Sequence, residues 1–379
     1  MPEPLAPSEL HVLALIDHLA LGGAEMLLSQ FVTAAPSSQI RVSVACLAER
    51  DGNPAGASLR AAGVEPVTLG VPARPGLSLL RAVRQHIATL APQIVHTHLG
   101  TSDWVGGLAS RSLGVPMISS IHTAVWGRDP ELYLKRLVVR LCAARLVAVS
   151  AGARDAYAAR GWASRRQLVT IPNGIDVDAL PGAGAIVRRE FGWDERHFVV
   201  GMLSALRPEK AHDVALEAVG RLSDRLPLLR LLIVGSGPDH DRVRRLAEPL
   251  GNIVAMAGAR SDVMRCMDAF DVCIHPSRAD AFPTTLIEAM AGSVPVVATR
   301  VGGIPEIVAD GRTGVLIPAP PSAEVLARAL EPLCHDAPRR AALARAARSE
   351  YERRFTAGPW IRRIRAMYDD VLAEHRRRQ

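Results

Sequence analysis

The stretch Pro276–Ala291, which reads PSRADAFPTTLIEAMA, decides the fold. It lies between two short apolar runs, Val272–His275 and Val294–Thr299, that have the character of buried strands. From Thr285 onward its apolar residues have the spacing of a helix. A buried strand, a polar loop, a helix and another buried strand form the repeating unit of an open parallel α/β sheet.

The same alternation fills the rest of the chain. A Gly- and Pro-rich stretch, Pro172–Gly184, has the composition of a linker and separates two periodic regions. We therefore expect two doubly wound sheets. The expected strands of the first are His11–Asp17, Arg41–Leu47, Val64–Leu69, Ile94–His98, Pro116–His122, Leu146–Ser150 and Leu168–Pro172. Those of the second are Phe198–Leu203, Arg230–Val234, Ile253–Ala257, Val272–His275, Val294–Thr299 and Val315–Ile317.

Helical patterns lie between these strands and fill the C-terminal tail. A long final helix is expected to cross back and pack on the first domain. The predicted boundaries are residues 1–178 with the crossover helix 357–379 for the first domain, and residues 185–354 for the second.

Composition excludes several functional classes. The chain has 379 residues with 49% apolar and 22% charged residues, and a formal net charge of +7. No stretch reaches the roughly 18–20 apolar residues of a membrane span, and the N terminus lacks the pattern of a secretory signal. Five scattered cysteines argue against a disulfide framework or a zinc site and favour the cytoplasm. No basic block resembles a nucleic-acid-binding arm, and no strand is followed by the GxGxxG of a dinucleotide-dependent oxidoreductase.

Lysine is rare in this chain. Only Lys135 and Lys210 are lysines among 45 basic residues, so a retained lysine suggests a position that needs a compact ammonium group. Lys210 ends the segment Leu206–Lys210, which follows an expected strand and opens a helix. Lys210 and Arg207 would then lie beside a helix N terminus, where a diphosphate can bind. A solvated turn with a proline at the helix start explains the same residues equally well.

Further loops follow strands at the edge where α/β sheets bind ligands. Gly22 and Gly23 open a helix with little side-chain bulk, which lets an anion approach backbone N–H groups. Gly235 and Gly237 bracket a turn suited to a flat base, and Arg260 follows the next strand. Tight turns alone account for such glycines as often as ligands do.

The deciding stretch carries a candidate ligand-binding site. Asp280 precedes Glu288 by eight residues, with a helix start between them. The loop amides and helix N terminus offer an anion site, and Glu288 can accept hydrogen bonds from a ribose diol. The candidate ligand-binding residues of this stretch are Asp280, Ala281, Phe282, Pro283, Thr284, Thr285, Leu286 and Glu288.

Three histidines stand at strand ends of the first region. His96 and His98 alternate on one strand and are expected as core or hinge residues, while His122 ends the next strand and is expected to contact substrate. No carboxylate or cysteine joins them at ligand spacing, so we expect no metal site.

In this order the motifs resemble the family 4 retaining glycosyltransferases, which have the GT-B fold, and the resemblance covers nearly the whole chain. The motifs are GGAE (22–25), VHTHL (95–99), His122, VAVS (147–150), IPNGID (171–176), LRPEKAHDV (206–214), VGSGP (234–238), the 277–291 segment, PVVAT (295–299), VGGIPEIV (301–308) and DGRTGVL (310–316). The resemblance implies two Rossmann-like domains that face a central cleft.

It also implies a hexosyltransferase of bacterial polysaccharide biosynthesis. A UDP- or GDP-sugar would donate its sugar, with retained configuration, to a hydroxyl of a glycan, a lipid-linked acceptor or a small molecule. Neither metal nor other cofactor is implied, because basic side chains and helix N termini would neutralise the leaving diphosphate.

The resemblance assigns roles to single residues. Lys210 matches the lysine at the diphosphate, Asp280 the first acid of the family's pair, which contacts sugar hydroxyls, and His122 a histidine near the donor sugar. With Arg207 these form the expected catalytic set. Glu288 matches the ribose-binding acid.

The chain departs from the family pattern in several places. Ala205 stands where an arginine is usual, Asp280 replaces glutamate, and Ala211 and Ala281 replace glycines. These changes leave open a non-catalytic nucleotide-sugar-binding protein, and an epimerase on a GT-B fold is a further alternative.

A basic helix is expected over residues 131–145. Its leucines and its cations occupy different faces, which leaves two possibilities open. The helix can bury its apolar face on the sheet, or it can lie on an anionic membrane to reach a lipid-linked acceptor. The apolar face comprises Leu134, Leu137, Val138 and Leu141, and the cations are Lys135, Arg136 and Arg140.

Overall fold

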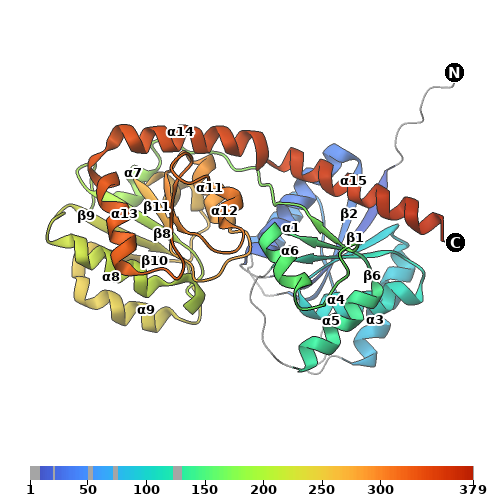
Figure 1. The fold of residues 1–379 in the computed structure, drawn as a ribbon. Coiled ribbons are helices and arrows are strands. Elements are labelled where there is room, and N and C mark those ends of the chain that lie inside the picture. The colour runs from blue at the N-terminus through green and yellow to red at the C-terminus, as the bar shows by residue number, and fades with distance from the viewer. Residues whose placement is uncertain (1–8, 20–21, 50–53, 71–75, 123–129, 379) are drawn as a thin grey trace, which may run out of the picture. The chain divides into compact units, whose positions relative to one another are not determined.

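The computed structural model describes residues 9–19, 22–49, 54–70, 76–122 and 130–378 (Figure 1). The N-terminal stretch in which no secretory signal was expected therefore lies largely outside the described residues. The chain forms two compact units, Met1–Ile175 together with Thr356–Gln379, and Asp176–Phe355. The prediction of two doubly wound parallel sheets is confirmed. Within the described part of the chain, no helix combines the length and the apolar character needed to cross a bilayer.

The first unit contains a seven-stranded parallel sheet in the order β3-β2-β1-β4-β5-β6-β7. β4, its central strand, is buried along its whole length because helices cover both faces of the sheet. β3 is much shorter than expected and exposed, as suits an edge strand. The strands are β1 (Leu10–Leu19), β2 (Ile40–Glu49), β3 (Val67–Thr68), β4 (Ile94–His98), β5 (Met117–Ile121), β6 (Ala143–Ala148) and β7 (Leu168–Thr170).

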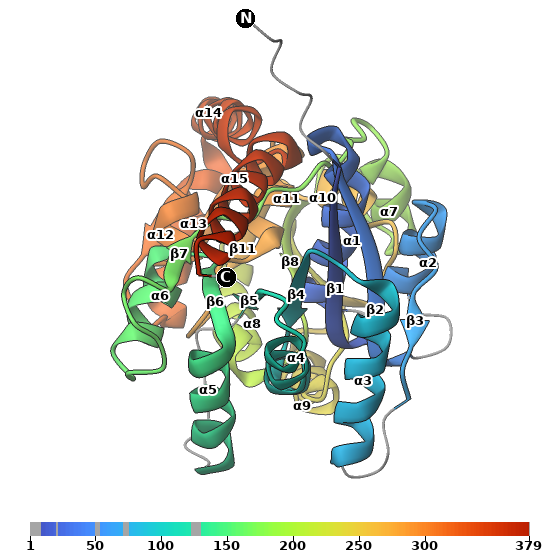
Figure 2. The same cartoon turned by 90° about the vertical axis from the view of Figure 1, so that its right-hand side faces the viewer.

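Helices cover the two faces of this sheet. Val95 of β4 packs towards α3 and α4, while its neighbour His96 points to the opposite face and contacts Phe31 of α1 and Tyr368 of α15. Figures 1 and 2 show these two groups of helices on either side of the strands. The helices are α1 (Gly23–Ala34), α2 (Pro54–Ala61), α3 (Leu77–Leu90), α4 (Gly100–Ser112), α5 (Pro130–Cys142), α6 (Ala151–Ala158) and α15 (Ala357–Arg376), with a 3-10 turn, η1 (Ala35–Ser38), after α1.

The last helix, α15, belongs to the first unit, as predicted. The Tyr368 hydroxyl lies 2.6 Å from Nδ1 of His96, and Arg365 donates to the carbonyl oxygen of Ser38. The chain returns to the first unit beside Gly174, where a Cβ atom would lie 2.3 Å from the Thr356 carbonyl oxygen. Close backbone packing therefore requires a glycine at position 174 of the expected linker.

The second unit contains a six-stranded parallel sheet in the order β10-β9-β8-β11-β12-β13. The strands are β8 (Phe198–Leu203), β9 (Leu229–Val234), β10 (Val254–Gly258), β11 (Val272–His275), β12 (Val296–Thr299) and β13 (Val315–Ile317). The helices are α7 (Gly184–Glu190), α8 (His212–Ser223), α9 (His240–Ala247), α10 (Val263–Asp268), α11 (Thr284–Ala291), α12 (Ile304–Ile307), α13 (Ala323–His335) and α14 (Ala337–Arg354). Two 3-10 turns, η2 (Pro208–Lys210) and η3 (Glu248–Ile253), complete it.

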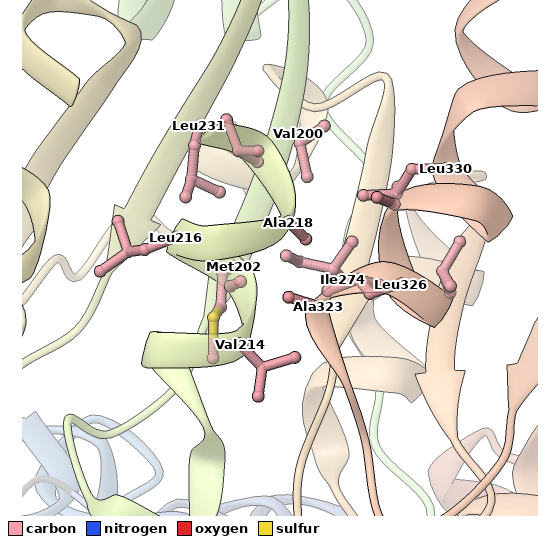
Figure 3. Packing of buried hydrophobic residues seen from close by; sticks show 14 of the residues in the cluster. Val200, Met202, Val214, Leu216, Ala218, Leu231, Ile274, Ala323, Leu326 and Leu330 are labelled. Atoms are coloured by element: carbon pink, nitrogen blue, oxygen red, sulfur yellow. The ribbon is translucent and has the colours of Figure 1, made fainter. Parts of the chain in front are cut away.

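Strand periodicity divides the second sheet into two faces. Val200 and Ile274 point into a buried cluster with Leu326 and Leu330 of α13, as Figure 3 shows. Gly201 points to the opposite face, where a Cβ atom would lie 2.0 Å from the Phe270 ring. Each fully buried leucine of the cluster contributes about 2 kcal/mol. This packing fixes the carboxyl ends of the strands, from which the loops of the candidate site arise.

Helix α5 does not bury its leucine face on the sheet, which was one of the two possibilities for this helix. Leu134 and Leu141 are each 64% exposed, and Val139 on the opposite side is fully buried. The cause is Asp103, which is buried and whose charge is balanced by Arg136 at 3.1 Å. A buried carboxylate requires a partner, and this requirement turns the side of α5 that carries Arg136 inward, while Arg140 stays exposed.

Candidate functional site

The loop after β11 leads directly to the N terminus of α11. Ala281 and Phe282 are buried in this loop, and no side chain caps the helix at Pro283. The Thr285 hydroxyl donates to the Leu203 carbonyl oxygen at 3.2 Å, which fixes the first turn to the end of β8. The first N–H groups of the helix therefore belong to a rigid element and carry the positive end of its dipole.

The position of Asp280 is set by a glycine turn after β12. The N–H of Gly303 donates to the Asp280 carbonyl oxygen at 3.3 Å. Gly302 has a φ of +51°, and a Cβ atom there would lie 1.7 Å from the same oxygen. Only glycine allows this approach, so the 302–303 turn defines where the Asp280 backbone lies.

Lys210 reaches Asp280 from a second loop. It ends the 3-10 turn η2 and is followed by Ala211, which has a φ of +59°. The two loops are joined by the N–H of Arg278, which donates to the Glu209 carbonyl oxygen at 2.7 Å. Lys210 Nζ lies 2.5 Å from Asp280 Oδ2, so residues 70 positions apart in the sequence form one ion pair.

His275, the last residue of β11, contacts the same oxygen. Its Nε2 lies 2.9 Å from Asp280 Oδ2. Burial opposes ionisation of Asp280, but the hydrogen bond from His275 and the charge of Lys210 outweigh it and hold the pKa of Asp280 well below its ordinary value. The carboxyl group is therefore ionised at neutral pH.

Glu288 lies one turn into α11. Burial raises the pKa of its carboxyl group from 4.5 to about 7. Within the described part of the chain, its Oε2 atom is buried without a hydrogen-bond partner. An unpaired buried acceptor costs free energy unless a ligand satisfies it, and a pair of hydroxyl groups is a suitable partner.

The three histidines predicted at strand ends of the first unit form one group around His98. His98 Nδ1 lies 3.0 Å from His122 Nε2, and His96 is satisfied by Tyr368 and Ser120. Burial lowers the pKa of His122 to about 4, so its ring is neutral at pH 7. The three imidazoles line a cavity of about 20 Å³, room for a single water molecule. Among the described residues, no group of three or more His, Cys, Asp and Glu side chains is arranged to hold a metal ion.

The N terminus of α1 holds a carboxylate of its own. Gly22 precedes α1, and a Cβ atom there would lie 2.3 Å from Oε2 of Glu25. Glu25 is buried and lies 3.2 Å from His18 Nε2. Packing of this side chain explains Gly22, while nothing lies within 4 Å of a Cβ atom at Gly23.

Two family matches together cover most of the chain. Residues 21–179 match Glycosyltransferase Family 4, and residues 185–350 match Glycosyl transferases group 1. A D-inositol 3-phosphate glycosyltransferase of Stackebrandtia nassauensis is 31% identical over 304 residues, which are 74% of this chain and 68% of that protein. This chain belongs to glycosyltransferase family 4.

The similarity to a second curated relative covers less of the chain. A D-inositol 3-phosphate glycosyltransferase of Segniliparus rotundus is 34% identical over 247 residues, which are 59% of this chain. The chain spans about half the length of that relative, 54%.

Solved structures share the fold. Anabaena Alr3699/HepE in complex with UDP-glucose has a TM-score of 0.83 at 23% identity, over 96% of this chain and 99% of that one. Sucrose-phosphate synthase from Thermosynechococcus elongatus has a TM-score of 0.78 at 20% identity, over 96% of this chain and all of the other. The GT-B fold predicted for this family 4 chain is thereby confirmed.

Other predicted residues lie outside the Lys210–Asp280 group. Arg207 is exposed, since the chain turns after the buried Leu206. Arg260 forms ion pairs with Asp262, at 2.7 Å, and with Glu190, so two carboxylates already share its guanidinium group. Its role at a donor stays a prediction.

Gly235 and Gly237 are explained by backbone packing. Cβ atoms there would lie 2.0 Å from the Ser204 carbonyl oxygen and 2.4 Å from that of Leu206. The glycines let the loops after β8 and β9 contact each other, and a contact with a base stays a prediction.

Sequence reasoning missed His275. Its position as the last residue of a buried strand, five residues before Asp280, was a usable signal, since strand ends meet at the ligand-binding edge.

Proposed function

We propose that this chain transfers a hexosyl group from a nucleoside-diphosphate sugar to a hydroxyl acceptor with retained configuration. The observation that carries the proposal is the ion pair between Lys210 and Asp280 beside the uncapped start of α11. An ammonium group and a helix N terminus can together bind a diphosphate, and an ionised carboxylate can bind sugar hydroxyls. The complex of Anabaena Alr3699/HepE with UDP-glucose, which has the same fold, supports a nucleotide-sugar donor.

In the proposed reaction the bond between C1 of the sugar and the diphosphate oxygen breaks as the acceptor oxygen bonds to C1 on the same face. The acceptor proton passes to the departing phosphate. Lys210 and the α11 N–H groups stabilise the charge that develops on the leaving group, a role that a metal ion fills elsewhere. We therefore expect the reaction to proceed in the presence of EDTA.

Other side chains bind and orient the donor in this proposal. Asp280 accepts hydrogen bonds from sugar hydroxyls, and Glu288 accepts them from the ribose diol. His122, whose low pKa keeps it neutral, contributes a hydrogen bond to the sugar rather than a positive charge. Gly22, Gly23, Arg207 and Arg260 remain proposed donor contacts.

Lys210→Ala provides the test. We expect at least a hundredfold loss of sugar release from UDP-glucose or GDP-mannose, because the leaving diphosphate loses its cation. The exposed Arg207→Ala serves as a comparison at the same loop and should lose less. Unchanged turnover in Lys210→Ala would contradict the assignment. Donor binding without consumption by the wild type would indicate a binding protein, and conversion of the donor into an isomeric nucleotide sugar, without an acceptor and without sugar release, would indicate an epimerase.

We further propose that α5 contacts an anionic membrane surface and brings a lipid-linked acceptor to a cytoplasmic enzyme. Leu134, Leu137 and Leu141 are 64%, 48% and 64% exposed on one side of α5, and Arg140 is exposed beside them. Exposed leucines next to cations are typical of helices that lie at a lipid interface.

Replacing the three leucines by glutamine should lower binding to phosphatidylserine-containing vesicles at least tenfold. Leu246→Gln, which changes a 41% exposed leucine of α9, is the matched control and should have no effect. Cosedimentation measures both. Equal binding of the triple variant and the wild type would exclude α5 as the contact.

A further inference from the structure

His275 occupies a position from which it can control Asp280. It is the last residue of β11, and its side chain is only 2% exposed. Cys273, two residues earlier, lies beside Gly201 on the sheet face that packs on Phe270, and burial together with the nearby Glu288 carboxylate of α11 raises the pKa of its thiol. His275 projects to the same face of the sheet, which is the side of α11. The imidazole is therefore held by a rigid strand and not by a loop.

The contact between His275 and Asp280 has a defined direction. A carboxylate only accepts hydrogen bonds, so Nε2 of His275 must carry the hydrogen. Burial lowers the pKa of His275, although Asp280 opposes this effect, so Nδ1 carries no proton. Within the described residues Nδ1 is buried and has no partner. Within the described residues, the ring therefore makes one hydrogen bond, to Asp280. Burying the unpaired Nδ1 costs free energy, and a residue that only filled the core would not need this ring.

Both donors to Asp280 use the same oxygen. Lys210 Nζ and His275 Nε2 lie 2.5 and 2.9 Å from Oδ2. Lysine has a flexible side chain and would hold a carboxylate loosely by itself, whereas an imidazole fixed on a strand defines one orientation. With Oδ2 held by two donors, the orientation of Oδ1 is fixed as well.

We infer that His275 is a positioning residue that sets the Asp280 carboxylate against Lys210 for contact with the donor sugar. This inference rests on the proposed function. His275 is thereby a third member of the group formed by Lys210 and Asp280. It gives the short aspartate side chain a partner that is fixed on strand β11.

The test compares His275→Leu with His275→Gln. Leucine keeps the apolar volume but removes the donor, while the glutamine Nε2 can donate near the position of the imidazole Nε2. We expect His275→Leu to lower kcat/KM for UDP-glucose about tenfold or more and His275→Gln to stay within about threefold of the wild type. A core role predicts the reverse order, because leucine suits a buried site better than glutamine.

Asp280→Asn supplies an independent readout. If His275 acts through Asp280, adding His275→Leu to Asp280→Asn should cost less than about twofold further. Melting temperatures separate misfolding from loss of positioning, since the inference requires an activity defect in a His275→Leu protein that melts like the wild type.

The outcomes distinguish the inference from the proposed function. A wild-type protein that neither binds nor turns over UDP-glucose, UDP-N-acetylglucosamine or GDP-mannose overturns both. An active wild type with an equally active His275→Leu overturns the inference alone, and so do fully additive effects of His275→Leu and Asp280→Asn.

Discussion

Replacing Glu288 by glutamine should stabilise the second unit at pH 8 and change it little at pH 5. The Glu288 carboxyl group has a pKa of about 7 in the folded chain and an ordinary value of 4.5 when the chain is unfolded. The folded state therefore binds a proton more tightly than the unfolded state. Stability falls as the pH rises from 4.5 to 7, because the unfolded chain ionises first.

The magnitude follows from the difference in pKa. Each pKa unit corresponds to about 1.4 kcal/mol, so the difference amounts to about 3 kcal/mol at pH 8. At pH 5 the cost is under about 1 kcal/mol. Because Glu288 keeps part of its surface exposed, we expect about 2 kcal/mol of gain in Glu288→Gln at pH 8. For a unit of this size that gain raises the melting temperature by about 4–8 °C.

Glu350→Gln is a control of opposite sign. Hydrogen bonds from Arg353 and Arg354 lower the pKa of Glu350 to about 2 against the burial that would raise it. This stabilisation is present above pH 4.5 and is lost as the pH falls towards 2. The variant should lose about 1 kcal/mol at pH 8, since its arginine partners are partly exposed, and less at low pH.

Calorimetry of the ligand-free variants between pH 5 and pH 8 measures both effects. A stability gain in Glu288→Gln that does not grow over this range would refute the reasoning. It would mean that the buried carboxyl group has a partner that keeps it ionised.

Two further predictions concern the packing around Asp280 in the second unit and around His96 in the first. Gly302→Ala should lower the free energy of unfolding by about 2 kcal/mol or more and the affinity for UDP at least tenfold, because the new methyl group meets the Asp280 backbone. Its control is Gly311→Ala, where φ is +70° but the space is open, and which should lose only about 1 kcal/mol of stability. Calorimetric titration should show unchanged UDP binding in the control. Tyr368→Phe should destabilise the first unit by about 1–3 kcal/mol, since His96 loses its 2.6 Å partner, and a thermal scan that shows no change would contradict that role.

The sequence predicted most strands well because buried parallel strands are continuous apolar runs. Ile94–His98 and Phe198–Leu203 have the predicted bounds. The strand predicted over Val64–Leu69 was too long because at the sheet edge an apolar run can lie outside the ladder. Short helices such as α12 were missed, since four residues carry too little periodicity.

The site was predictable in part. The rule that strand ends meet at one edge brings the loops of Lys210 and Asp280 together, but it cannot say that the ammonium group would contact the carboxylate directly. The inward turn of α5 depends on Arg136 and Asp103, which are 33 residues apart, and no local pattern reveals such a pair.

The placement of α15 has a consequence for biosynthesis. All residues of the second unit, 176–355, are synthesised before α15, the helix that packs on Phe31 and His96 through Trp360 and Tyr368. The first half of the nascent chain therefore keeps an incompletely covered hydrophobic surface until α15 has been synthesised. A premature stop before α15 would damage the part of the protein that was synthesised first.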